Sequence, residues 1–162
     1  MRIVLFGEDI LREVSEPISA IDQEVVELAE AMFDTMYRER GIGLAAVQVG
    51  RLVRMFITHV PDDEPRVYIN PEIIGTSIEE WKYEEGCLSI PGLNADVIRP
   101  AAVKIQALNL RGRAFTLDAE GLLGRAIQHE LDHLNGVLFL DKLKPKKREK
   151  LLKDYDPVQA QV

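Results

Sequence analysis

QHELDHLNG, Gln128 to Gly136, contains two of the three histidines in the chain. His129 and His133 are four residues apart, so on a helix they share one face, with Cβ atoms about 5–6 Å apart. Two imidazoles at that separation can hold one metal ion, and Glu130 can reach a water molecule beside it. The pattern His-Glu-x-x-His on a helix is typical of a metal site in which the glutamate acts as general base.

The residues around this motif have the spacing of one helix with two apolar sides. One side consists of Leu123, Ile127, Leu131 and Leu134, and the other of Leu122, Ala126 and the two histidines. A helix that is apolar on two sides is usually buried, and buried histidines need partners. Asn135 and Gly136 supply a C-terminal end. An amphipathic helix with two surface histidines is the alternative interpretation, because so short a pattern also arises by chance.

Length and composition predict one domain over residues 1–162. A chain of this length can bury about 70% of its unfolded surface, and 46% hydrophobic with 29% charged residues is typical of a soluble globular protein. The single cysteine excludes an internal disulfide and favours a reducing, intracellular compartment. The apolar run from Ile3 to Phe6 is too short for a signal-peptide core, and no stretch is long enough to span a membrane. We therefore expect no membrane partner.

Hydrophobic spacing predicts the other elements. A helix is expected from Asp22 to Arg40, with Asp22 as its cap and Gly41 at its end. The remaining predictions are strands at Leu52–Val60 and Arg66–Asn70, a strand pair or curved strand at Glu72–Tyr83, a hairpin at Val103–Leu117 and a last helix at Lys146–Asp154, opened by Pro145. The tail PVQAQV, residues 157–162, is expected to be frayed.

The segment GIGLAAVQVG, Gly41 to Gly50, does not match a phosphate-binding loop, because it lacks the third glycine and the Lys-Ser/Thr pair. A helix cap followed by a buried turn is the plain interpretation. The functional interpretation is an extended segment whose backbone stays accessible at Gly43 and could pair with a peptide by strand addition. Gln48 is the only side-chain amide in the segment, and in apolar surroundings it needs a partner, for which a substrate carbonyl is a candidate.

Cys87 is a candidate third metal ligand, in the strand-like segment EEGCLSIPG, which is expected to end at Pro91 and Gly92. A buried cysteine that packs as a small apolar residue is the more common case, but a catalytic metal site needs three protein ligands and one open position. The rivals are weak: the metzincin spacing would place the third ligand at Phe139, and a downstream glutamate would be Glu149, inside a run of Lys and Arg. His59, at the end of a predicted strand, is expected to be a surface residue. Cys87 remains by elimination.

Three segments together resemble the peptide deformylase family. GIGLAAVQ, EGCLS and QHELDH are similar to its three signature motifs, in the expected order and spacing, and the resemblance covers nearly the whole chain. Two positions differ from many members: Val47 stands where proline is common, and Arg125 borders the side-chain pocket, where an apolar residue is frequent. The first changes only backbone stiffness and affects no chemical role.

The resemblance implies an α+β fold in which mostly antiparallel strands surround a central metal-bearing helix, with one helix in the N-terminal half and another at the C-terminus. It implies a hydrolase that removes the N-formyl group from the formyl-methionine of newly synthesised proteins and releases formate. It also implies a cytoplasmic enzyme whose partners are nascent formyl-methionyl chains. The family uses Fe²⁺ natively, whereas Zn²⁺, Ni²⁺ or Co²⁺ can occupy such a ligand set.

The same resemblance implies the roles of individual residues. Cys87, His129 and His133 would bind the metal, Glu130 would be the acid and base, and Gln48 with the backbone N–H of Leu88 would hold the formyl oxygen. The expected substrate-binding residues are Ile42, Gly43, Tyr83, Glu85, Leu122 and Ala126, with the aliphatic stem of Arg125 beside them. Glu85 and Gln128 are further candidates for orienting the histidines.

Two other functions and one further partner stay open. A metallopeptidase could use the same helix motif but would cut internal amides, and a non-catalytic metal-binding protein would give Glu130 no necessary role. Residues 142–153 carry seven Lys or Arg and one Glu, a local charge of +6. The net charge of the whole chain is −7, so the other residues together carry −13. The total argues against DNA binding. The basic segment is either a solvated helix face or a contact with ribosomal RNA near the nascent-chain exit.

Overall fold

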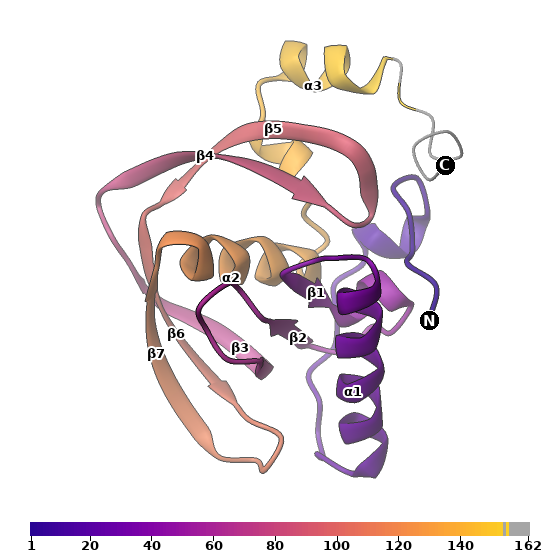
Figure 1. Ribbon diagram of the computed structural model, residues 1–162, viewed down its shortest axis with the longest axis vertical. Helices are drawn as coiled ribbons and strands as arrows, with labels where there is room; N and C mark the ends of the chain where they lie inside the picture. The colour runs from indigo at the N-terminus through magenta and orange to yellow at the C-terminus, as the bar shows by residue number, and fades with distance from the viewer. Residues whose placement is uncertain (154, 156–162) are drawn as a thin grey trace.

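The computed structural model describes residues 1–153 and residue 155 (Figure 1). Its helical elements are η1 (Asp9–Arg12), α1 (Gln23–Arg38), η2 (Ala46–Val49), α2 (Gly121–Leu134), η3 (Phe139–Lys142) and α3 (Pro145–Leu152). Its strands are β1 (Gly43–Ala45), β2 (Met55–Thr58), β3 (Arg66–Thr76), β4 (Glu80–Cys87), β5 (Ile90–Pro100), β6 (Ala102–Leu108) and β7 (Ala114–Glu120). The architecture is α+β, as the sequence predicts. Among the described residues, none of the helices combines the length and the apolar character that crossing a membrane requires.

The strands form two antiparallel sheets. Five strands are hydrogen-bonded in the order β1-β2-β3-β6-β7, and β4 and β5 form a separate two-stranded sheet. β1 is an edge strand: it pairs with β2, with Gly43 opposite Thr58 and Ala45 opposite Phe56. One edge of the glycine-containing segment is therefore left without a strand partner.

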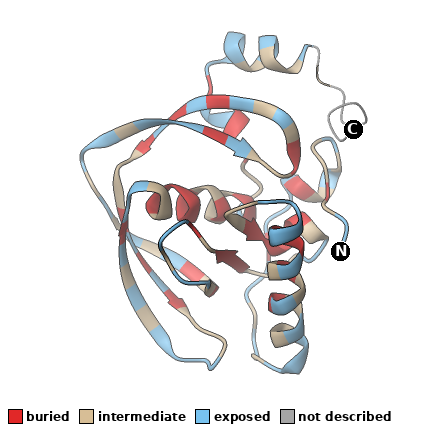
Figure 2. Cartoon of the chain, in the orientation of Figure 1, coloured by how far each residue is buried: buried red, intermediate tan, exposed pale blue. Residues whose placement is uncertain are grey.

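Helix α2 lies between the two sheets and is the most buried of the described α-helices (Figures 1 and 2). Its apolar stripe packs into a core with β2, β3, β6 and β7, as the spacing predicts; this core includes Phe56, Tyr68, Ile105, Ile127 and Leu134. The opposite side of α2 meets the β4–β5 sheet through polar contacts. One predicted side of α2 therefore packs into the core, and the other faces the candidate site.

Helix α1 begins where the sequence predicts, because the Asp22 side chain accepts a hydrogen bond from the backbone N–H of Val25 at 3.1 Å. It ends earlier than predicted, at Arg38. Gly41 was expected to end a helix that runs to Arg40, but Arg40 already lies beyond the helix, in the left-handed conformation with φ of 59°. This expectation was wrong.

Two further strand predictions need correction. Glu72–Tyr83 is not a strand pair: β3 continues to Thr76 and pairs with β6, whereas β4 starts at Glu80 and pairs with β5. Gly75 marks an irregularity in the β3–β6 register and not a turn. Pro91 and Gly92 lie inside β5 and do not end a strand; the chain reverses between Cys87 and Ile90. The predicted hairpin at Val103–Leu117 is confirmed, as β6 and β7. The predicted frayed tail lies outside the described residues, as does Asp154, the predicted end of the last helix.

Candidate active site

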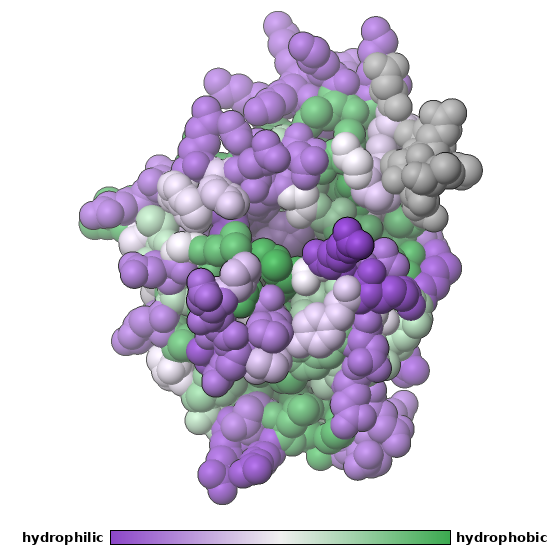
Figure 3. Space-filling view, in the orientation of Figure 1, coloured by the Kyte–Doolittle hydropathy of each residue, from purple (hydrophilic) through white to green (hydrophobic). Residues whose placement is uncertain are grey.

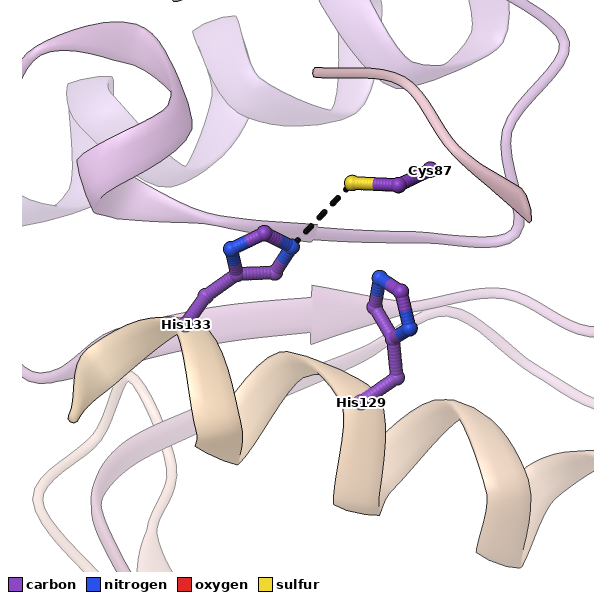
Figure 4. Close-up of side chains that lie close together, drawn as sticks. All are labelled: Cys87, His129 and His133. Atoms are coloured by element: carbon purple, nitrogen blue, oxygen red, sulfur yellow. Dashed lines mark hydrogen bonds between the residues drawn. The ribbon is translucent and has the colours of Figure 1, made fainter. Parts of the chain in front are cut away.

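Cys87, His129 and His133 lie close together although the cysteine and the first histidine are 42 positions apart in the sequence (Figure 4). Cys87 ends β4, and the two histidines project from one face of α2. The potential ligand atoms all lie within 4.8 Å of one another, and Cys87 Sγ is 3.3 Å from His133 Nε2. The structure therefore brings together the three residues that the sequence selects, and neither His59 nor Glu149 is part of this group.

Glu85 orients the first histidine. Its Oε1 lies 2.9 Å from His129 Nδ1, which leaves the other ring nitrogen for the side of Cys87. Arg99 donates two hydrogen bonds to the Glu85 carboxylate, at 2.6 and 3.0 Å, and one to Asp132 at 2.8 Å. Burial works against the charge of Glu85, but the bonds with His129 and Arg99 outweigh it and hold the pKa of this carboxyl well below its usual range. Glu85 is thus a buried, charged anchor for His129.

Arg125 completes this polar layer. It donates to Glu85 Oε2 at 2.7 Å, to the Val97 carbonyl at 2.9 Å and to the Trp81 carbonyl. Its guanidinium also stacks against the rings of Trp81 and Tyr83, with 5.2 and 5.9 Å to the ring centroids. Arg125 thus reaches from α2 to bind Glu85 and to pack against the aromatic rings of β4. These contacts join the polar side of α2 to the β4–β5 sheet.

Glu130 is buried beside the three potential ligands. It is 3% exposed, and its Oε1 has no hydrogen-bond partner among the described residues. Burial raises the pKa of Glu130 to about 7, and the nearby Glu85 acts in the same direction. A carboxyl group with such a pKa can both accept and release a proton near neutral pH. The unpaired oxygen leaves room for a partner that the protein itself does not supply.

Gln48, at the end of the glycine-containing segment, is 1% exposed. Its Oε1 accepts a hydrogen bond from the backbone N–H of Ala45 at 2.9 Å, which fixes the orientation of the amide. Its Nε2 then points to Ser89 Oγ at 3.1 Å and to Cys87 Sγ at 3.6 Å. The Gln48 amide therefore presents its donor end, not its acceptor end, to the Cys87 side of the site.

Gln48, Cys87, His129 and Glu130 line one cavity of about 570 Å³, in the face that Figure 3 shows to be hollowed, with apolar side chains along the recess. Leu88 lies in the cavity wall, as do all six residues expected to bind the substrate: Ile42, Gly43, Tyr83, Glu85, Leu122 and Ala126. Gly43 lies against Glu130, since a Cβ at this position would come within 2.8 Å of Glu130 Oε2.

Sequence reasoning missed Arg99, Asp132 and Ser89. Asp132 and Ser89 lie inside the QHELDH and EGCLS segments but were given no role, whereas Arg99 lies on β5, outside the three motifs. Gln128, a candidate for orienting a histidine, instead donates to the carbonyls of Pro100 and Gly124, at 3.0 and 3.1 Å. For Arg99, the available signal was its place in the alternation of β5, where its side chain points inward with those of Ala95 and Val97.

The chemistry of this group fits a divalent metal ion. One thiol and two imidazoles are ligands that such ions accept. Burial lowers the pKa of His133, as does the neighbouring His129, so this ring is held neutral, as a ligand must be. Burial also opposes a proton on His129, but the adjacent Cys87 and Glu85 raise its pKa well above its usual value. The negative surroundings that favour a proton there favour a metal cation too.

The fold and the site define the class: a metal-dependent hydrolase with a Cys-His-His group on a helix and a neighbouring strand. The model of the polypeptide deformylase family matches residues 1–149. Peptide deformylases from Acinetobacter baumannii and Afipia carboxidovorans are 44% and 48% identical, over 98% and 94% of this chain and 92% of each relative. The chain therefore belongs to the polypeptide deformylase family, whose members remove the N-formyl group from the formyl-methionine of newly synthesised proteins.

Solved structures agree with this assignment. A crystal structure of a peptide deformylase from Legionella pneumophila has a TM-score of 0.91 and 38% sequence identity, and covers 99% of this chain and 98% of that one. The peptide deformylase from Ehrlichia chaffeensis in complex with actinonin has a TM-score of 0.92 and 38% identity, with 94% of both chains covered. The fold expected from the sequence is confirmed.

Proposed function

We propose that residues 1–162 form one catalytic domain in which Cys87, His129 and His133 hold a single divalent ion. Fe²⁺ is the expected ion in the cell, and Zn²⁺, Ni²⁺ or Co²⁺ suit the same ligands. The observation that carries the proposal is the position of Glu130, a buried carboxyl with an unpaired oxygen beside these ligands and inside the cavity. A metal-binding site without catalytic function would have no use for such a group.

When bound, a divalent ion would lower the pKa of a water molecule to about 7 and polarise a carbonyl group. Glu130 accepts the proton of the water that attacks the formyl carbon. Gln48 Nε2 and the backbone N–H of Leu88 donate hydrogen bonds to the oxyanion that develops. Glu130 then gives its proton to the departing amine, so that formate and a free N-terminal methionine are released. The raised pKa of Glu130 suits both proton transfers.

The substrate backbone pairs with the free edge of β1, in the manner of strand addition. Gly43, with no side chain, allows this approach next to Glu130. The methionine side chain lies in the apolar part of the cavity, formed by Ile42, Tyr83, Leu122 and Ala126. Glu85 contributes differently from its neighbours, because its two oxygens are bound to His129, Arg99 and Arg125. It holds the wall of the site and the first histidine in place.

Formate release from a formyl-methionyl peptide, measured together with metal content, tests the proposed function. The purified chain should release formate from formyl-Met-Ala-Ser-amide and leave the unformylated peptide intact. A metallopeptidase would cut the internal amides of both peptides. Loss of activity on metal removal, with recovery on adding Fe²⁺ or Ni²⁺ under anaerobic conditions, is expected. An apoprotein as active as the metal-loaded protein would contradict the proposal.

We also propose that the enzyme acts in the cytoplasm on nascent chains and that the basic segment, residues 142–153, contacts the ribosome. The support is the position of α3, which stands outside the β4–β5 sheet and has no buried residue (Figure 1). Lys146, Lys147 and Lys150 are all exposed. Lys and Arg clusters supply salt-dependent affinity for phosphates, and docking near the exit site would raise the local concentration of substrate.

Charge reversal at Lys146, Lys147 and Lys150 separates ribosome contact from a solvated face. Under the proposal the triple Glu variant co-sediments less with ribosomes at low salt, whereas formate release from a short peptide is unchanged. Truncation is a poorer test, because Leu143, Leu151 and Leu152 pack against the apolar cluster that contains Ile90 and Phe139. Co-sedimentation equal to that of the unmodified protein across a salt series would contradict the ribosome contact.

A further inference from the structure

Arg40 occupies a backbone conformation that usually belongs to glycine. Its φ is 59°, its N–H donates to the carbonyl of Tyr37 at 3.1 Å, and the N–H of Gly41 donates to Met36 at 2.9 Å. These bonds close the end of α1 in the pattern of a Schellman motif, in which the left-handed residue is usually glycine because a Cβ is crowded there. A glycine stands one position later in the chain, but the strained position carries an arginine.

The strain is at the mouth of the catalytic cavity. Arg40 is one of the residues that line this cavity, together with Gly41, Ile42 and Gly43. Non-glycine residues in the left-handed region persist where the surroundings enforce them, and such outliers gather at functional sites. We therefore expect the Arg40 side chain to have a function, which offsets the small loss of stability caused by its left-handed backbone.

The guanidinium of Arg40 is exposed, and among the described residues it makes no hydrogen bond or ion pair. Arg38, two residues earlier, behaves differently: it pairs with Glu39 at 3.1 Å and donates to the Met1 carbonyl at 2.7 Å. Arg125 also lines the cavity, but it is bound to Glu85. Within the described part of the cavity wall, Arg40 is thus the cation that has no partner in the protein itself.

The course of the substrate brings its downstream residues past Arg40. Gly43, the first residue of β1, lies against Glu130, and Arg40 precedes it by three residues and lines the same cavity. A substrate strand with its formyl end at Glu130 runs antiparallel to this segment and advances about 3.4 Å per residue. The second to fourth substrate residues therefore pass within reach of an arginine side chain at position 40.

We propose that Arg40 is a specificity-determining residue that pairs with a carboxylate on the second, third or fourth residue of the formyl-methionyl substrate. The planar guanidinium matches a carboxylate in geometry and charge. In a chain with a net charge of −7 and with Glu39 and Glu84 in the same cavity wall, an acidic substrate meets repulsion that Arg40 offsets. This inference rests on the proposed function, because it assumes that the substrate lies along β1.

The test uses formyl-Met tetrapeptide amides with a single Asp or Asn at position two, three or four. The C-terminal amide is essential, because a free terminal carboxylate would itself pair with Arg40. In the unmodified, metal-loaded protein, kcat/KM for the Asp peptide should exceed that for its Asn counterpart about two- to fivefold at one position or more at low salt. The ratio should fall at high salt, since an exposed pair is screened.

Arg40→Gly should abolish the preference while raising the melting temperature, because glycine relieves the left-handed strain. Arg40→Asn, which also tolerates this conformation, is a second uncharged variant. Arg38→Ala removes the same charge two residues away and should keep the preference. A purely structural role for Arg40 predicts no change in the Asp/Asn ratio in any variant.

Equal kcat/KM for Asp and Asn peptides at all three positions would overturn the inference, and so would a preference that survives both Arg40 variants. A lower melting temperature for Arg40→Gly would contradict the argument from strain. Absence of formate from every peptide, the Asn series included, is a different result: it contradicts the proposed function, and the inference fails with it.

Discussion

Gly43 and Glu130 lie in direct contact: a methyl group on residue 43 would come within 2.8 Å of Glu130 Oε2 and 3.1 Å of its Cγ. The edge strand that is to carry the substrate backbone thus touches the carboxyl that is to move the proton. Glu130 is buried between Gly43 and the cavity, so a side chain at residue 43 would have to displace its carboxyl group. The first signature motif and the third are coupled at this contact, although 87 residues of sequence separate the two positions.

Gly43→Ala should lower activity about 10- to 100-fold while the protein stays folded, because the new Cβ would displace Glu130 and a misplacement of about 1 Å can cost about 100-fold. The circular dichroism spectrum and the metal content should be close to those of the unmodified protein. Gly75→Ala is the matched control, since its Cβ would meet only Lys104 Cβ, at 3.6 Å. Full activity of Gly43→Ala would show that the contact does not constrain Glu130.

Glu130→Ala should retain the metal and lose activity by about 10²- to 10⁴-fold, the usual effect of removing a general acid and base. The reason is that Glu130 lies beside the three proposed ligands but is not one of them. Metal analysis and formate release are measured on the same preparation. Glu30→Ala, at an exposed position on α1, is the control. A Glu130→Ala protein with full activity would remove this residue from the mechanism.

Cys87→Ala should lose metal affinity, and the unmodified enzyme should be inactivated by peroxide. A thiolate in an open metal site is exposed to stepwise oxidation, first to the sulfenic acid and then irreversibly to higher acids. Early inactivation should therefore be reversed by thiols and late inactivation should not. Metal occupancy in Cys87→Ala equal to that of the unmodified protein would remove Cys87 from the ligand set.

Much of this fold and site could be predicted from local pattern. The helix of the His-Glu-x-x-His motif is visible because its two stripes follow one period, and both histidines come from that same helix. Cys87 followed from the need for a third ligand. These are properties of short segments, which a sequence displays directly.

The failures share a different cause. Arg99 reaches Glu85 and Asp132 only after β5 has folded beside β4 and α2, so no spacing in the sequence indicates these two ion pairs. Pro91 and Gly92 have the composition of a strand end, but tertiary pairing with β4 carries the chain through them. Gly41 has the composition of a helix cap, yet Arg40 takes the left-handed conformation. Arg40 lines the active-site cavity, and departures from the local preference for glycine are expected at functional sites.

Arg99→Met should destabilise the protein by about 3 kcal/mol, the lower range for breaking a buried ion pair, because Arg125 still contacts Glu85. Arg99 is 4% exposed and neutralises both Glu85 and Asp132. Metal affinity should also fall by about tenfold or more, since Glu85 orients His129. Arg38→Met, which breaks an exposed pair with Glu39, should cost less than about 1 kcal/mol. Equal effects of the two changes in urea unfolding would contradict the importance of the buried layer.

The last prediction concerns the pH dependence of stability that arises from the contact between Arg12 and Asp141. Asp141 accepts hydrogen bonds from Arg12 at 2.6 and 3.2 Å and from the backbone N–H of Leu138 at 2.9 Å, and despite partial burial its pKa is lowered by these contacts. A carboxyl whose pKa is lower in the folded state stabilises the protein above its unfolded pKa, about 3.9, and loses that contribution as the pH falls through the folded pKa. Asp141→Asn should therefore be less stable by about 1 kcal/mol at pH 6, a modest figure because the pair is partly exposed. The difference from the unmodified protein should shrink below pH 4, as measured by urea unfolding at a series of pH values. A difference that stays constant down to pH 2 would mean that the charge of Asp141 contributes nothing.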